Sequence, residues 1–167
     1  MDSDALIKLA KCSAKEDIIR AAKVSIPSRV KVETVDEARL LGYPDAIVID
    51  ENIRGGRLEV VELDPRPDPP QADLFPAGGD RALFLAFSPG KWDAVVSDDS
   101  KLLRLLRAFG VPVLTPAALL VTLAKTGTVT VARARSALGA LAPLVSPDEY
   151  ATAQLALDAL KPKEVEP

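Results

Sequence analysis

Apolar residues in this chain recur mostly at helical spacing, with a few short stretches patterned as strands. Over residues 101–109 the leucines recur at intervals of three and four, which predicts an amphipathic helix that Gly110 ends. The same pattern, with capping residues at the starts and Gly or Pro at the ends, predicts further helices. These helices cover residues 5–12, 14–23, 29–41, 45–53, 80–87, 116–125, 131–141 and 147–160.

Three stretches are predicted to be strands. Residues 57–63 alternate polar and apolar side chains, and residues 93–97 and 111–114 are short apolar runs. Strands separated by helices are typical of an α/β fold with a small, mostly parallel sheet.

Prolines mark the interruptions of this pattern. Ile26-Pro27-Ser28 stops one helical segment, and Ser28 is suited to cap the next. Five prolines between positions 65 and 76 predict that residues 64–79 form a stiff surface loop without regular structure. Neither side of this loop would fold well alone, so residues 1–160 are expected to form one domain and residues 161–167 a frayed tail.

The amino-acid composition rules out several kinds of catalytic site, metal site and cross-link. The chain of 167 residues has no histidine and one cysteine, Cys12, which excludes Ser-His-Asp catalysis, thiolate zinc sites and disulfides. Any catalysis must therefore use carboxylates, Lys, Ser, Tyr or a bound cofactor. No apolar run spans a bilayer and the start does not resemble a signal peptide, so a cytoplasmic location is expected. Few Asn, Met and Cys with 14 prolines hint at a thermophile source.

Acidic residues follow or precede the predicted elements at two points. Asp98 and Asp99 come directly after the strand at 93–97, and Asp2 and Asp4 stand at the start of the first helix, which Asp4 is expected to cap. Ligands of parallel α/β sheets bind beyond the carboxyl ends of the strands. We therefore expect these two acidic groups to lie near one another.

Four stretches, in order, resemble the motifs of PIN-domain nucleases. They are DSDALIKLAK at 2–11, IPSRVKVETV at 26–35, GGDRALFLAF at 78–87 and DAVVSDDSKLLRLL at 93–106. The resemblance implies a three-layer α/β/α fold and a metal-dependent endoribonuclease that is often a homodimer. Some members are toxins paired with a small antitoxin protein. The first acid of the family ends a buried strand, whereas Met1 alone precedes Asp2 here.

The resemblance also implies a site. Asp2, Asp80 and Asp99 would hold Mg²⁺ or Mn²⁺, with Asp98 as the rival of Asp99, and Glu33 would orient or deprotonate the attacking water. Oxygen ligands suit these hard cations, and such an ion lowers the pKa of bound water and stabilises a leaving oxygen.

Two serines and four basic residues complete the expected site. Ser3 and Ser97 would hydrogen-bond the carboxylates. Within residues 8–31 a basic stretch could follow the phosphate backbone of single-stranded or loop RNA, although it could equally be an ordinary solvated helix face. Its candidate contacts are Lys8, Lys11, Arg29 and Lys31.

Two other functions fit the same sequence. A non-catalytic PIN-like module could bind nucleic acid through the basic stretch without a metal site. A small-molecule hydrolase could use Asp2 as a nucleophile with Asp4 two residues later, although the Lys and Gly-rich context expected of such enzymes is missing.

Overall fold

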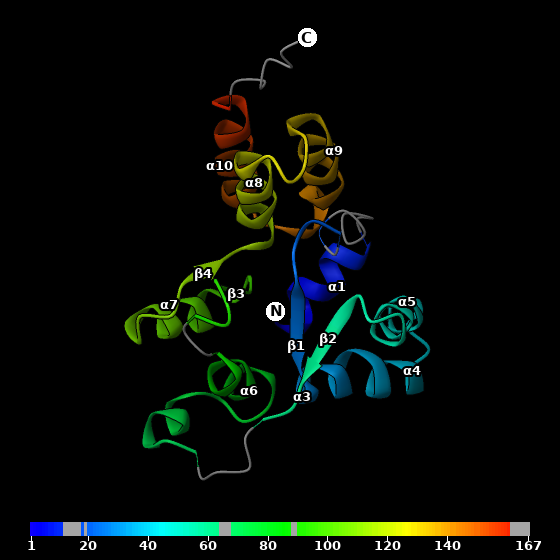
Figure 1. Ribbon diagram of the computed structural model, residues 1–167, viewed down its shortest axis with the longest axis vertical. Helices are drawn as coiled ribbons and strands as arrows, with labels where there is room; N and C mark the ends of the chain where they lie inside the picture. Colours follow the sequence, from blue (N-terminus) through cyan, green and yellow to red (C-terminus); the bar gives the residue numbers. More distant parts are fainter. Residues whose placement is uncertain (12–17, 19, 64–67, 88–89, 161–167) are drawn as a thin grey trace.

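The computed structural model describes residues 1–11, 18, 20–63, 68–87 and 90–160. Within this part the chain is α/β, with many helices around short strands that pair in parallel (Figure 1). Half of the helix predicted over residues 14–23, namely residues 14–17 and 19, lies outside the described residues. In the described ranges, no helix combines the length and apolar character needed to cross a membrane.

The strands form two parallel pairs. β1 (Val24–Pro27) pairs with β2 (Leu58–Val61), and β3 (Val95–Val96) pairs with β4 (Val113–Leu114). Both pairs are connected through helices, as parallel pairing requires. The predicted strands at 57–63, 93–97 and 111–114 are therefore present in shorter form.

Residues Met1 and Asp2 lie between the two strand pairs. The Met1 ammonium donates to the Ser25 carbonyl of β1 at 3.0 Å, and the Asp2 N–H donates to the Val96 carbonyl of β3 at 3.0 Å. Two residues thus bridge the inner edges of both pairs. The position of Asp2 is set by these backbone hydrogen bonds.

The helices of the first half surround this point. Their order is α1 (Ser3–Lys11), α3 (Ser28–Lys31), a π-helical segment (Val32–Glu37), α4 (Ala38–Leu40) and α5 (Pro44–Arg54). Residues 28–40 run without a break, so the helix predicted over 29–41 is present. Its π-helical part contains the buried Thr34, whose hydroxyl donates to the Val30 carbonyl at 2.8 Å. Such back-bonding competes with regular helix geometry.

Three local predictions are wrong. The stretch around Ile26 is not merely a break, because it forms strand β1. Ser28 is the first residue of α3, and the capping position belongs to Pro27 without a side-chain hydrogen bond. Inside the proline-rich loop, Pro70–Leu74 forms a 3-10 helix, since proline is tolerated in the first turn of a helix.

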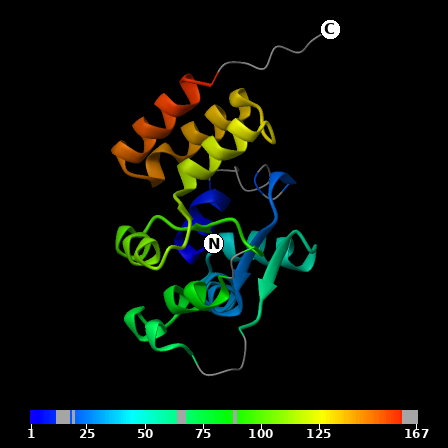
Figure 2. The same ribbon diagram turned by 60° about the vertical axis from the view of Figure 1, so that its left-hand side comes forward.

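Four of the five helices of the second half begin with a side-chain cap, and the first of them, which follows Gly78, does not. They are α6 (Gly79–Ala86), α7 (Ser100–Ala108), α8 (Pro116–Thr126), α9 (Val131–Leu141) and α10 (Pro147–Asp158). The Ser146 hydroxyl accepts from the Glu149 N–H at 3.2 Å, as the capping pattern predicts. The Glu149 carboxylate accepts from the Ala117 N–H at 3.1 Å and so joins α10 to the start of α8. These last three helices gather at one end of the molecule (Figure 2).

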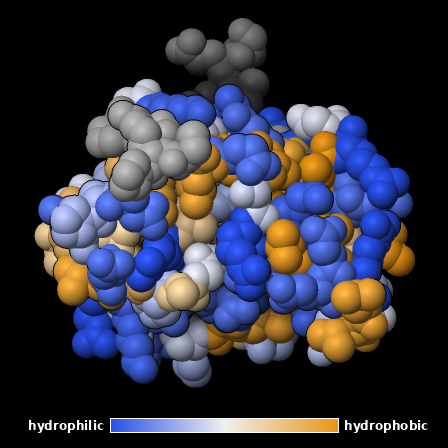
Figure 3. All heavy atoms as spheres, turned by 90° about the horizontal axis from the view of Figure 1, so that it is seen from below, coloured by the Kyte–Doolittle hydropathy of each residue, from blue (hydrophilic) through white to orange (hydrophobic). Residues whose placement is uncertain are grey.

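The core has two parts. The larger joins α1, β1 and α5 to α8, α9 and α10, and the smaller lies under α6 and α7 around Phe75, Leu83 and Leu106. Seen from below, the surface carries apolar groups separated by hydrophilic ones (Figure 3). The elements that carry the predicted acids are therefore anchored by buried side chains on both sides of the strands.

Candidate functional site

Each of the four predicted acids lies at or near a helix start, or within a helix. Asp2 directly precedes α1, Glu33 is in the π-helical segment, Asp80 is the second residue of α6, and Asp99 caps α7. These positions are far apart in the sequence. Helix N-termini favour negative charge, so the scaffold accommodates acids at three of these four points.

Asp2 is buried and hydrogen-bonded. Its side chain is only 7 % exposed, its Oδ1 accepts from the Ala5 N–H at 2.8 Å, and the Ser97 side chain hydrogen-bonds the same carboxyl group. Burial raises the pKa of Asp2, while the bonds from Ser97 and Ala5 oppose that rise. Asp2 therefore caps α1, and the prediction that Asp4 does so is wrong. Asp4 is exposed in the first turn.

Glu33 connects three segments through its carboxylate. Its Oε1 accepts from Arg29 Nε at 3.1 Å and from the Gly79 N–H at 3.2 Å, and its Oε2 accepts from the Ser3 hydroxyl at 2.7 Å. The side chain is held by the start of α6 and by the start of α1. Both serines expected to support the acids, Ser3 and Ser97, thus bond to site carboxylates.

Gly79 lets Glu33 approach α6 this closely. A Cβ atom on Gly79 would lie 2.9 Å from Glu33 Oε2. We expect Gly79→Ala to displace the Glu33 carboxylate and to break its hydrogen bond to the N–H of residue 79. Alanine favours a helix by up to about 1 kcal/mol over glycine, which offsets part of the cost of the lost contact. Hydrogen exchange of the residue 79 amide and thermal unfolding of this variant provide the test, and unchanged protection of that amide would contradict the role of the contact.

Asp80 lies among the other acids. Burial raises the pKa of Asp80, and the negative charges of Asp99, Asp2, Glu33 and Asp4 raise it further, in that order of effect. Charges act in this way only at short range, so the four predicted acids share one region of the molecule. Asp4, which was not among the acids predicted to hold a metal, adds a fifth carboxylate to it.

Asp98 and Asp99 have different surroundings. Asp99 Oδ1 accepts from the N–H groups of Lys101 at 2.6 Å and Leu102 at 3.0 Å. Asp98 forms an ion pair with Lys8 on α1. Of the neighbouring charges that raise the pKa of Asp80, that of Asp99 has the largest effect. This supports Asp99 over its rival.

The donor set suits a hard divalent cation in its chemistry. All its ligand atoms are carboxylate oxygens, which such cations prefer. The charges that shift the pKa of Asp80 are all negative, and a bound cation would compensate them. In the described part of the chain, no three acidic side chains are close enough together to hold one ion. Binding would thus require the carboxylates to come closer together than they are in this structure.

The basic residues predicted to contact RNA are paired with carboxylates. Lys8 pairs with Asp98, Lys11 with Asp45 at 3.7 Å, Arg29 with Glu33 and Glu37, and Lys31 with Asp36 at 3.6 Å. A phosphate would have to compete with these partners. The basic stretch within residues 8–31 is therefore weaker as a phosphate-binding surface than its sequence indicates.

A basic face that the sequence analysis passed over lies on α7. Lys101, Arg104 and Arg107 are exposed at intervals of three residues, on the side opposite the buried leucines of that helix. The helix begins directly after Asp99. The same leucine spacing that predicts α7 also determines this face, so the signal was present in the sequence.

Comparison of the chain with protein-family models, with curated proteins and with solved structures gives no match. The resemblance to PIN-domain nucleases therefore rests on the four sequence stretches alone.

Proposed function

We propose that this protein is a metal-dependent endoribonuclease with a PIN-like three-layer α/β/α arrangement. The observation that carries the proposal is that contacts bring the segments of the four acids together. Glu33 bonds to Ser3, the residue after Asp2, and to the N–H of Gly79, the residue before Asp80. Ser97, two residues before Asp99, bonds to Asp2, and the raised pKa of Asp80 agrees with this arrangement. Acids that repel one another destabilise a fold, and a bound divalent ion supplies the compensating charge. The order β2, β1, Met1–Asp2, β3, β4 supports the sheet of such a fold.

The chain's residues have separate roles in this proposal. Asp2, Asp80 and Asp99 would hold Mg²⁺ or Mn²⁺, which when bound supplies positive charge for an attacking water and a leaving oxygen. Glu33 would orient that water and accept its proton. Glu33 is suited to positioning, because Ser3 and the Gly79 N–H fix its carboxylate. Ser97 fixes Asp2 in the same way.

RNA cleavage is the direct test of activity. Single-stranded and structured RNAs should be cut in the presence of Mg²⁺ or Mn²⁺, and EDTA should abolish the cut. Asp80→Asn should remove cleavage, while Asp158→Asn should retain it, because Asp158 lies on α10 and pairs with Arg135 at 2.7 Å. Cleavage that persists in both Asp80→Asn and Asp99→Asn would rule out this site.

The basic face of α7 is the better candidate for the RNA backbone. Arg104→Ala should weaken RNA binding and reduce the slope of log affinity against log salt by about 0.7, as loss of one phosphate contact to a single strand does. Lys125→Ala, an exposed change in the last turn of α8, is the matched control. Filter binding at several salt concentrations measures both slopes, and equal slopes for wild type and Arg104→Ala would contradict the assignment.

A non-catalytic RNA-binding module is the second candidate. It is favoured by the present partners of the acids, since Asp99 caps α7 and Glu33 bonds to Arg29, Ser3 and Gly79. RNA binding that depends on Arg104, together with no cleavage and no ion binding, would support this alternative.

Protein partners are part of the proposal as well. Leu40, Leu41, Tyr43 and Ile47 are exposed on and around α4 and α5, with Leu40 88 % accessible. Such apolar groups are suited to contact with another protein. A second copy of the chain, or a small antitoxin protein, is the partner that the PIN resemblance implies. Sedimentation of the wild type against Leu40→Asp and Leu41→Asp together tests the homodimer.

A further inference from the structure

The exposed side of α7 combines basic residues with an aromatic ring. Lys101, Leu105 and Phe109 lie four residues apart, so their side chains form one row along the helix. Arg104 and Ala108, each one residue earlier in the sequence than a member of this row, form the row beside it. All five are exposed except Leu105, which is half-buried. A continuous surface therefore runs along α7, which lies at the outer edge of the molecule in both ribbon views (Figures 1 and 2).

The cations of this surface are available to a ligand. In the described part of the chain, neither Lys101 nor Arg104 forms an ion pair with a carboxylate, and Arg104 Nε donates to the Ser100 carbonyl at 3.2 Å. By contrast, Lys8 and Lys11 of α1 are held by acidic side chains. A phosphate can therefore bind to the surface of α7 without displacing a carboxylate.

The ring of Phe109, at the end of this surface, is fixed in orientation and still accessible. Its centroid lies 5.4 Å from that of Phe84 at an interplanar angle of 57°, and 5.8 Å from that of Phe75 at 41°. Those two rings stack on each other at 4.3 Å. Phe109 nevertheless remains 37 % exposed. A ring that is already fixed loses little conformational freedom when a planar ligand stacks on it, and this favours binding.

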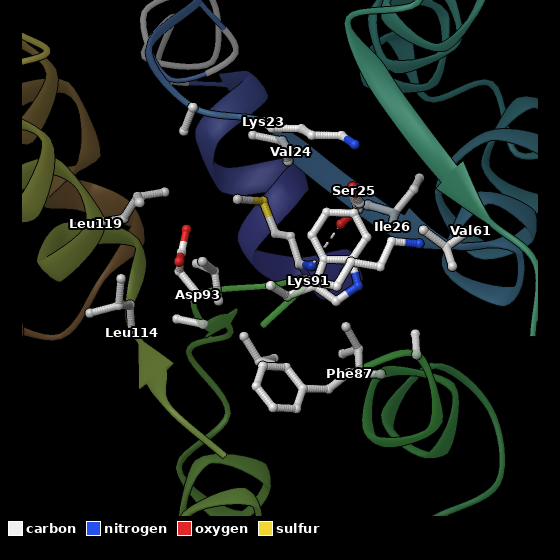
Figure 4. A pocket seen from close by; sticks show the side chains of 18 of the residues that line it. Lys23, Val24, Ser25, Ile26, Val61, Phe87, Lys91, Asp93, Leu114 and Leu119 are labelled. Atoms are coloured by element: carbon white, nitrogen blue, oxygen red, sulfur yellow. Dashed lines mark hydrogen bonds between the residues drawn. The ribbon is translucent and has the colours of Figure 1, made fainter. Parts of the chain in front are cut away.

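Trp92 carries another aromatic ring beside basic residues, but its surroundings differ. Its ring centroid lies 4.9 Å from Lys91 Nζ and 5.4 Å from Lys23 Nζ, and Lys23 also pairs with Glu59 at 2.9 Å. Both lysines border a cavity of about 590 Å³ between the two strand pairs (Figure 4). Trp92 precedes β3, whereas Asp99 follows it. This ring is thus already in contact with two cations, and it belongs to the other end of β3 from the predicted metal site.

The length of the α7 surface is that of a short RNA segment. Asp99 and Phe109 flank α7 and are ten residues apart, which corresponds to about 15 Å along the helix axis. Phosphates of a stacked strand follow one another at about 3.4 Å along its axis. A strand that runs along α7 from the acids therefore reaches the ring after about four nucleotides.

We propose that Phe109 is a base-stacking residue for single-stranded RNA. One unpaired base stacks on its ring, and the phosphates between that base and the acids contact Lys101 and Arg104. This inference rests on the proposed function, because it assigns part of the RNA surface of α7. Base-paired RNA fits poorly, since extracting a base from a duplex costs a few kcal/mol. Adenine gains more than uracil from stacking because its ring system is larger, so purines are preferred at this position.

The test compares RNA with a strand that has no bases. The probes are oligoadenylate of about ten nucleotides and an abasic ribose-phosphate strand of the same length, with binding measured in EDTA by fluorescence anisotropy. We expect Phe109→Leu to bind oligoadenylate about 5-fold or more weakly, as loss of one stacked base does, and to bind the abasic strand as wild type does. Leu155→Ala is the matched control, because Leu155 is an apolar side chain on α10 that is 70 % exposed. It should leave both affinities unchanged.

A second substitution keeps the proposal falsifiable if leucine loosens the packing against Phe75 and Phe84. Phe109→Tyr keeps the ring and should bind oligoadenylate within about twofold of wild type. Equal oligoadenylate affinities for wild type and Phe109→Leu would overturn the proposal, as would equal weakening of both strands or a Phe109→Tyr variant as weak as Phe109→Leu. A change in sedimentation of Phe109→Leu without a change in RNA affinity would assign the ring to a protein contact and would also overturn it.

The outcomes also separate this inference from the proposed function. Arg104→Ala should weaken binding of oligoadenylate and of the abasic strand alike, because it removes a phosphate contact. RNA binding that depends on Arg104 and not on Phe109 would overturn the stacking role alone and leave the RNA surface of α7 in place. A wild type that binds neither strand would overturn both.

Discussion

Replacing Asp80 with asparagine is expected to stabilise the metal-free protein and to abolish RNA cleavage. The pKa of Asp80 is raised by burial and by four neighbouring carboxylates, so its charge is unfavourable in the folded state. Removing that charge should raise stability by about 0.5–1 kcal/mol after solvent screening, or about 1–4 °C in melting temperature. Removing a charge that acts on the transition state should lower cleavage on the order of 10²–10³-fold.

The pH dependence has a definite sign. The folded-state pKa of Asp80 lies above its unfolded value of 3.8. Protonation of Asp80 therefore contributes fully to the stability of the fold below pH 3.8, and this contribution is lost as the pH rises through the raised pKa. The stability gap between Asp80→Asn and wild type should therefore open as pH rises from about 4 to neutrality. Thermal unfolding in EDTA measures this gap, with Asp158→Asn as the control. A less stable Asp80→Asn at pH 7 would contradict the account.

Two substitutions at Asp99 are expected to separate its structural role from its role at the site. Asp99 caps α7 through the N–H groups of Lys101 and Leu102. Asparagine caps helices as well as aspartate does, whereas alanine costs about 1 kcal/mol. Asp99→Asn should keep stability and lose cleavage on the order of 10²–10³-fold, and Asp99→Ala should lose both.

The comparison of these two variants has a clear negative outcome. If Asp99→Asn cuts RNA as well as wild type while only Asp99→Ala fails, Asp99 is a capping residue and nothing more. Chemical denaturation and initial cleavage rates, measured on the same preparations, distinguish the two cases.

The helices of this protein could be predicted from the sequence better than its strands. α7, α8, α9 and α10 follow from leucine and alanine spacing with local caps, and those signals need no tertiary information. β1 has only four residues and contains Pro27. A short apolar run does not show whether a segment is a strand, part of a helix or a break between helices. The parallel partner of β1, strand β2, lies more than thirty residues later in the sequence.

Other errors arise where contacts between distant segments decide the structure. Asp2 caps α1 because its backbone is held between β1 and β3, and that position cannot be read from the residues around it. The π-helical geometry around Glu33 likewise accompanies buried side chains and a Thr34 back-bond. Spacing alone predicted an ordinary helix over this segment.

The candidate site shows the same limit. The four acids were predicted from the resemblance to a family, and the effect of the other three on the pKa of Asp80 agrees with their being neighbours. The ion pairs could not be predicted, because Lys8 meets Asp98 and Lys11 meets Asp45 only after folding. Because these lysines are paired with carboxylates, the basic stretch within residues 8–31 is less available for contact with RNA.

The most direct test of the account is a Mn²⁺ titration followed by electron paramagnetic resonance, which distinguishes free from bound ion. The account predicts saturable Mn²⁺ binding by the wild type, loss of that binding in Asp80→Asn and Asp99→Asn, and its retention in Asp158→Asn. A wild type that binds no Mn²⁺ at millimolar concentrations, or binding that Asp80→Asn leaves unchanged, would contradict the claim that these carboxylates form a metal site.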